Sequence, residues 1–171
     1  TEFTEAVDVV GRVLERFGQK GKLAVRLITN GSLMHRPDVQ AGIRHLAEMG
    51  GEVWFKIDRA IAAEVAEVNG TPCQVAKMAK NLEICAGLAP TWVQTCWFAM
   101  DGVAPSPGAV DAYCALLQPL AAKLSGIHLY GLARPSFQPA AARLGRLTAD
   151  ELQAVGETIK NKTGIRVMVS P

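Results

Sequence analysis

The sequence predicts an α/β domain whose parallel strands curl into a partial (β/α) barrel of the TIM type. Strand-like and helix-like segments alternate along the chain, and this alternation favours a parallel sheet built from βαβ units. The middle strands carry one apolar and one mixed polar face, whereas a flat parallel sheet between two helix layers is apolar on both faces. The polar residues lie toward the carboxyl ends of the strands, where barrels bind their ligands.

Periodicity and turn signals place the elements in order. The strands are expected at residues 22–29, 52–58, 91–99, 126–132 and 165–170. Helices are expected to begin near Phe3, at Pro37, at the caps Thr71-Pro72 and Ser106-Pro107, and at Thr148, where Glu151 completes a capping box.

A helix therefore precedes the first strand, although an α/β fold normally opens on a strand. The chain also begins at Thr1 and not at a methionine. We therefore expect residues 1–171 to be a single domain, the C-terminal part of a longer barrel whose N-terminal strands are missing from this segment.

Composition excludes several functional classes. The 18 basic and 16 acidic side chains leave a net charge of +2, so no basic footprint for nucleic acid or an anionic membrane is expected. No apolar run approaches the roughly 18 residues of a membrane span, and the N-terminus lacks the pattern of a signal peptide. A soluble, cytoplasmic protein is the simplest expectation. The cysteines are too widely spaced for a metal site and are expected to be reduced thiols: Cys73, Cys85, Cys96 and Cys114.

The strand in GEVWFKIDRA, residues 51–60, has the clearest polar face. Side chains alternate along a strand, so Lys56 and Asp58 share the face opposite the apolar residues. Two charges that leave water together are costly unless they meet each other, a ligand or a solvent-filled cleft. The next two strands repeat the pattern with Gln94, Cys96, His128 and Tyr130.

Four ordered segments resemble the radical S-adenosylmethionine (SAM) superfamily. They are ITNGS at 28–32, VWFKID at 53–58, QTCWFAMDG at 94–102 and HLYGLARPS at 128–136. The resemblance covers nearly the whole chain and implies a partial barrel of about six strands, of which residues 22–29 are the third and 52–58 the fourth.

The resemblance also implies cofactors. Such enzymes hold a four-iron four-sulfur cluster on a C-x3-C-x2-C loop and bind the methionine amine with a Gly-Gly-Glu-Pro segment. This sequence has neither, and both would precede Thr1, so the segment alone is expected to be inactive. The resemblance implies that the parent, reduced by a partner such as flavodoxin or ferredoxin, cleaves SAM to a 5′-deoxyadenosyl radical that acts on a small or unknown substrate.

Residue roles follow from the same resemblance. Thr29 and Asn30 would lie near the methionine end of SAM, and Lys56 and Asp58 would reach its carboxylate or ribose hydroxyls. The remaining cofactor contacts would come from Gln94 and, around adenine, from Tyr130, Gly131, Leu132 and Ala133. Substrate contacts would come from Cys96, His128 and Arg134.

Structural roles remain open beside these. Lys56 and Asp58 could pair with each other or with Arg26, and Asn30 could simply form a turn. His128 could be a hydrogen-bonded residue of the interior, Cys96 a buried thiol, and Arg134 a partner in a salt bridge at the rim.

Two other classes of function are possible. A truncated barrel could act as a binding or scaffolding module that docks through its open edge. A lyase with Lys56 as a Schiff-base nucleophile is disfavoured, because Asp58 should keep the amine protonated.

Overall fold

The structure is a computed structural model and describes residues 2–72, 74–134, 136–137 and 139–171. Its main element is a parallel five-stranded sheet in the order β1-β2-β3-β5-β7. The strands are β1 Arg26–Thr29, β2 Glu52–Lys56, β3 Thr91–Cys96, β5 Gly126–Tyr130 and β7 Val167–Ser170. The predicted parallel sheet is confirmed. An antiparallel pair, β4 Ala99–Met100 with β6 Leu144–Gly145, was not predicted.

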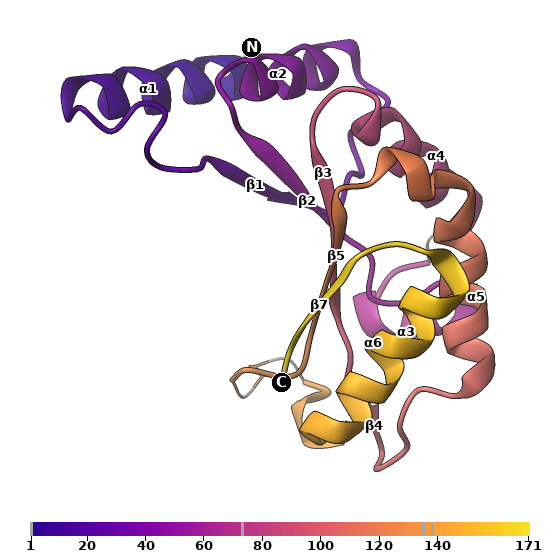
Figure 1. The fold of residues 1–171 in the computed structure, drawn as a ribbon. Helices are drawn as coiled ribbons and strands as arrows, with labels where there is room; N and C mark the ends of the chain where they lie inside the picture. The colour runs from indigo at the N-terminus through magenta and orange to yellow at the C-terminus, as the bar shows by residue number, and fades with distance from the viewer. Residues whose placement is uncertain (1, 73, 135, 138) are drawn as a thin grey trace.

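Helices cover one side of the curved sheet, and its other face has no helical layer (Figure 1). They are α1 Glu2–Arg16, α2 Pro37–Glu48, α3 Ala62–Asn69, α4 Val75–Ala86, α5 Pro107–Leu117 and α6 Ala149–Thr163, with 3-10 turns at Gln118–Lys123 and Ala141–Arg143. This arrangement is the one expected of a partial barrel, with helices outside and a concave inner face.

The predicted alternation of faces is confirmed on the central strands. The side chains that point toward the helices are fully buried and form the core with Leu46, Leu82, Tyr113, Leu117 and Leu152. From the sheet they include Val53, Phe55, Ile57, Val93, Ile127 and Leu129. Their neighbours on the opposite face are only partly buried.

Three of the expected helix starts are confirmed. Pro37 is the first residue of α2. Ser106 caps α5 through its side chain, which accepts a hydrogen bond from Ala109 N. Thr148 and Glu151 form the reciprocal capping box of α6.

The cap expected at Thr71-Pro72 is wrong. An unpredicted helix, α3, ends there at Gly70, whose φ of 68° is left-handed. Pro72 lies two residues later, where proline commonly follows a helix end because it cannot continue the helix. The next helix, α4, begins only at Val75, after Gln74.

The strands are also shorter than expected. Residues 22–25 are not part of β1, because the amides of Lys22 and Leu23 bond back to Gln19 O in a turn. The strand begins at Arg26, which is paired in register with Glu52 of β2. The last expected strand likewise starts two residues late, at Val167.

Candidate functional site

The open face of the sheet carries two adjoining groups of side chains, which meet where His128 is in register with Gln94. We call Lys56, Asp58, Gln94, Cys96 and Tyr130 the polar cluster. It lies toward the carboxyl ends, where Lys56 is in register with Gln94, and Cys96 with Tyr130. We call Trp54, Trp92 and His128 the aromatic cluster. Its two tryptophans are in register one row closer to the amino ends.

Lys56 and Asp58 form an ion pair in the polar cluster. The Lys56 Nζ to Asp58 Oδ2 distance is 3.3 Å, and the Asp58 side chain is only 11% exposed. Asp58 Oδ1 also accepts a hydrogen bond of 2.7 Å from Cys96 N, so the carboxylate links β2 to β3. The possible partner Arg26 instead binds Glu52, at 2.7 Å.

Lys56 is protonated, because its surroundings raise the pKa of its amine. Burial opposes it, but the negative charge of Asp58 and the hydrogen bond to that carboxylate, with smaller effects of Tyr130 and Cys96, raise the pKa of Lys56 above its ordinary value. The ammonium is therefore protonated, paired with a carboxylate and a poor nucleophile. This supports the sequence argument against a Schiff-base role.

Cys96 and Tyr130 are neutral hydrogen-bonding groups. Burial, helped by Asp58, raises the pKa of the Cys96 thiol to about 11. Burial also raises the pKa of Tyr130, although Lys56 opposes the shift. Cys96 Sγ lies 3.8 Å from Gly131 O, to which it donates. Neither side chain is activated for nucleophilic attack near neutral pH.

Gln94 has an unsatisfied polar atom at the centre of the polar cluster. Its Oε1 is buried and has no hydrogen-bond partner among the described residues. A buried acceptor without a partner is costly, and such a group often marks the place of a missing donor. Gln94 is therefore the member of the polar cluster whose hydrogen bonding the described residues leave incomplete.

Thr29 and Asn30 form the turn that follows β1. Thr29 Oγ1 accepts from Gly31 N at 3.0 Å, and Asn30 Oδ1 accepts from Ser32 N at 3.1 Å. Gly31 needs its left-handed φ of 66°, and a Cβ there would come within 2.2 Å of the Phe55 ring. The turn role that the sequence left open for Asn30 is present, and its side-chain nitrogen remains available.

The segment after β5 borders the polar cluster from the other side. Gly131 is buried, and its N–H donates to Ser170 O at 3.2 Å. Leu132 is partly buried, and Ala133 and Arg134 are exposed. Arg134 and Arg146 line a cavity of about 260 Å³, and Arg146 donates to Ala133 O at 3.3 Å. Sequence reasoning did not single out Arg146. The adjoining Pro135 lies outside the described residues.

Arg59 is a buried cation that sequence reasoning missed. Its side chain is 6% exposed and faces Glu64 at 3.9 Å. Its guanidinium donates to the carbonyls of Asp58 at 2.8 Å and Phe98 at 3.2 Å, and at 3.5 Å to that of Cys96. Arg59 therefore fixes the backbone on which two members of the polar cluster stand.

His128 belongs to the aromatic cluster. Its ring lies 4.4 Å from both Trp54 and Trp92 and is nearly parallel to Trp92, at 23°. Burial, with the charges of Arg26 and Arg166, lowers the pKa of His128, and Glu52 opposes this only in part. His128 is the register partner of Gln94, but its ring stacks on the tryptophans, where the sequence left open a hydrogen-bonded role.

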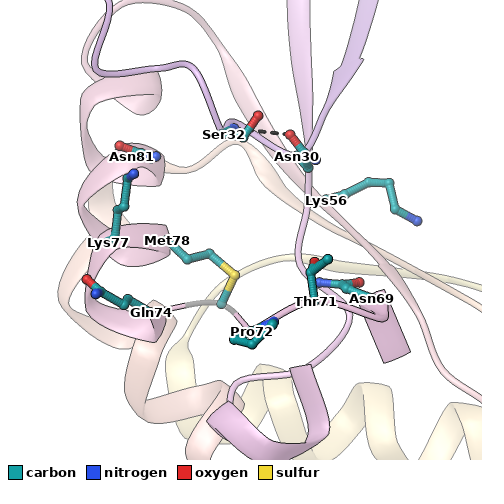
Figure 2. A pocket seen from close by; sticks show the side chains of 10 residues that line it. All are labelled: Asn30, Ser32, Lys56, Asn69, Thr71, Pro72, Gln74, Lys77, Met78 and Asn81. Carbon is teal, nitrogen blue, oxygen red and sulfur yellow. Dashed lines mark hydrogen bonds between the residues drawn. The ribbon is translucent and has the colours of Figure 1, made fainter. Parts of the chain in front are cut away.

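A cavity of about 600 Å³ adjoins the polar cluster. It lies between the turn after β1 and α4, and Asn30 and Lys56 are the two predicted site residues that line it (Figure 2). Lys77, Asn81 and Thr71 line it as well and were not predicted. Volumes of this size are typical of small-molecule sites.

The described residues carry neither a metal-binding group nor a membrane-spanning helix. Within the described ranges, no group of three or more histidine, cysteine, aspartate or glutamate side chains could hold a metal ion. None of the helices in the described part of the chain has the length and apolar character that crossing a membrane requires.

Comparison with solved structures identifies the class of fold. No protein-family model matches the chain, and no curated protein matches its sequence. The chain has the fold of a solved radical SAM methyltransferase and of a domain of a pyruvate-formate lyase-activating enzyme, so the fold implied by the sequence resemblance is confirmed.

Two structures illustrate this likeness. A domain of a pyruvate-formate lyase-activating enzyme from Bacteroides vulgatus aligns with a TM-score of 0.67 and 13% identity, over 100% of this chain and 95% of that domain. A radical SAM methyltransferase from Sphaerobacter thermophilus aligns with a TM-score of 0.59 and 14% identity, over 85% of this chain. This chain spans only 39% of the methyltransferase.

Proposed function

We propose that this chain is the C-terminal part of the barrel of a radical SAM enzyme and that its polar cluster binds SAM. One observation carries the proposal. The polar cluster lies on the sheet face without helices, at the carboxyl ends of parallel strands, and parallel α/β folds bind ligands at that end. The likeness of the fold to a radical SAM methyltransferase supports the choice of cofactor.

The side chains of the polar cluster fit SAM. The Lys56 ammonium, whose pKa is raised, suits the carboxylate of the methionine moiety. Asp58 and the unsatisfied Gln94 Oε1 are acceptors for the ribose hydroxyls. Thr29 and Asn30 would border the methionine end, and Tyr130 with the backbone of Gly131, Leu132 and Ala133 would border adenine.

The residues of this chain would bind and orient SAM and exclude water from it. When bound and reduced, SAM supplies a 5′-deoxyadenosyl radical for hydrogen abstraction. Cys96 remains a protonated thiol at neutral pH, and Arg134 at the rim would bind an anionic part of a substrate. The described part of the chain offers no set of ligands for an iron–sulfur cluster, so a cluster would have to be held by residues outside it.

The free edge of β1 supports the idea that further strands complete the barrel. β1 has β2 on one side only, and Ile28 is 55% exposed. A mostly apolar groove of about 230 Å³ runs beside the strand, lined by Phe3, Leu27, Leu33, Met34, Val39 and Ile43 among others. An open edge beside apolar surface is a place where another strand pairs. The same edge is the observation that favours the second candidate, a non-catalytic module that docks through β1.

The remaining parts of the proposal concern partners and place. We propose a small molecule of unknown class as substrate, flavodoxin or ferredoxin as the reductant, and the cytoplasm as the location.

Anaerobic reconstitution tests the function. The protein, expressed with any segment that its gene encodes before Thr1, should show absorbance of an iron–sulfur cluster and release 5′-deoxyadenosine from SAM on reduction. Lys56→Ala and Asp58→Ala should each slow this release, whereas Arg26→Ala, which removes a cation from the same sheet outside the polar cluster, should not. A reconstituted protein that forms neither cluster nor 5′-deoxyadenosine would favour the docking module.

A further inference from the structure

The cavity between the turn after β1 and α4 has polar walls. Four of its ten lining residues carry amides and two carry hydroxyls, whereas none of the ten is acidic. Amides both donate and accept hydrogen bonds, as hydroxyl groups do. Walls of this composition suit a ligand that carries several hydroxyl groups.

Two amides on opposite walls keep a free polar atom. Asn30 uses its oxygen to accept from Ser32 N, and Asn81, which is buried, uses its nitrogen to donate to Gly31 O at 3.0 Å. These two bonds fix the side chains on the two walls. The Asn30 nitrogen and the Asn81 oxygen have no further partner among the described residues.

Lys77 gives the cavity its net charge. Figure 2 shows Lys77 projecting from α4, while Lys56 stands opposite and directs its ammonium away from that helix. Asp58 neutralises Lys56 at 3.3 Å, whereas Lys77 has no acidic partner among the described residues. On the same helix, Lys80 is paired with Glu83 at 3.1 Å. The cavity thus presents one uncompensated ammonium.

We propose that this cavity binds a small polyhydroxylated anion and that Lys77 binds the phosphate or carboxylate of that ligand. The amides and hydroxyls of the walls bind the hydroxyl groups of the ligand. Asn30 and Lys56 belong both to this cavity and to the proposed SAM site, so the bound anion lies next to SAM. Its role as the substrate rests on the proposed function, whereas its binding does not.

Titration with three probes tests the proposal. Ribose 5-phosphate, ribonate and uncharged ribose are added separately to the protein, and binding is followed by calorimetry and by amide shifts of residues 30–32, 69–71 and 74–81. At least one of the two anions should bind about tenfold more tightly than ribose, because a hydrogen bond to a charged donor is markedly stronger than a neutral one. The anion that binds more tightly assigns the site to phosphate or to carboxylate.

Variants of Lys77 and Lys80 test whether the Lys77 ammonium causes the preference for the anion. Lys77→Ala should abolish the preference for the anion and leave ribose binding unchanged, Lys77→Arg should keep the preference, and Lys80→Ala should change neither. Equal binding of all three probes, no binding of any, or a preference that survives Lys77→Ala would overturn the proposal. A parallel titration with SAM separates the two proposals, because Lys77→Ala should leave SAM binding intact. If the unaltered protein does not bind SAM, only the proposed function is refuted.

Discussion

The polar cluster and the aromatic cluster stand side by side on the same strands, and His128 is the register partner of Gln94, yet the two clusters have opposite chemistry. In the polar cluster an ion pair, a thiol and an unsatisfied amide oxygen share a partly buried surface. In the aromatic cluster a histidine is stacked against two tryptophans, and Arg26 and Arg166 lie over the tryptophan rings at 5.2 and 5.5 Å.

Under the proposed function, the difference separates binding from stability along one sheet. In barrels the carboxyl ends of the strands carry function and the amino ends carry stability. Stacked rings and cation–π contacts stabilise without any ligand, whereas a buried acceptor without a partner costs free energy until a ligand supplies the donor. Changes to the aromatic cluster should therefore affect folding, and changes to the polar cluster should affect binding.

The largest expected loss of stability comes from replacing Arg59, which binds the backbone carbonyls next to the polar cluster. Arg59→Leu should lower the free energy of unfolding by about 3 kcal/mol, because it removes a buried cation and leaves Glu64 and the Phe98 carbonyl without their partner. The Asp58 carbonyl keeps its second donor, Trp97 Nε1. Arg26→Leu removes an exposed pair and should cost less than about 1 kcal/mol. Urea denaturation measures both. Equal losses of unfolding free energy in the two variants would show that Arg59 does not fix the backbone of Asp58 and Cys96.

The aromatic cluster should be sensitive to a single methyl group. Gly126 has a φ of 153°, and a Cβ there would come within 2.3 Å of the Trp92 ring and 3.0 Å of Arg166 O. Gly126→Ala should therefore strain the backbone, displace the ring and cost about 1 to 3 kcal/mol. At Gly108 a Cβ would meet only Ser106 Oγ, at 3.7 Å, and Gly108→Ala should be nearly neutral. Near-UV circular dichroism and urea denaturation should register the first change alone. SAM affinity unaffected by Gly126→Ala, relative to Gly108→Ala, would confirm that the clusters are independent.

Gln94→Leu should separate stability from binding. Removal of the unsatisfied Oε1 should raise the free energy of unfolding by about 1 kcal/mol, while SAM binding weakens because a ribose hydroxyl loses its acceptor. Urea denaturation and equilibrium dialysis measure the two quantities. A variant that is less stable, or that binds SAM as before, would show that Gln94 is a structural residue.

The two clusters should respond to opposite ends of the pH scale. The pKa of His128 is lowered from 6.5, so the unfolded chain binds a proton more readily, and the stability contributed by neutral His128 should fall as the pH drops below 6.5. The pKa of Cys96 is raised from 9.0 to about 11, so its contribution should fall as the pH rises from 9.0 through 11.

Proton NMR and alkylation check these small shifts. The His128 imidazole should titrate below 6.5, and His45, whose pKa is raised mainly by its hydrogen bond to Asp8, should titrate above 6.5. Alkylation of Cys96 should accelerate only in alkali, and at lower pH in Asp58→Asn, because that carboxylate disfavours the thiolate. The same titration point for both histidines would contradict the stacked environment of His128.

Much of the fold could be predicted because local signals and the fold agree. Alternation within one strand placed Lys56 and Asp58 on the open face, and the caps at Ser106 and Thr148 began their helices where expected. Thr71-Pro72 misled because proline follows a helix end as readily as it begins a helix. Because the dipeptide was interpreted as a helix start, the helix that ends just before it, α3, was not predicted.

The site was harder to predict because it depends on contacts between strands. His128 could be assigned to the open face, but its place between Trp54 and Trp92 depends on the register of three strands. Arg59 follows its strand in sequence, and only the fold brings the carbonyls of Cys96 and Phe98 to it. Lys77 lies on a helix whose start was misplaced, so its cavity could not be foreseen.

The SAM dissociation constant, measured in the protein with any segment encoded before Thr1, tests the central claim most directly. Lys56→Ala should weaken SAM binding by about tenfold, the loss of one charge-assisted hydrogen bond, whereas Arg26→Ala beside the aromatic cluster should leave it unchanged. An unchanged constant in Lys56→Ala, or equal weakening by both variants, would contradict the assignment of SAM binding to the polar cluster.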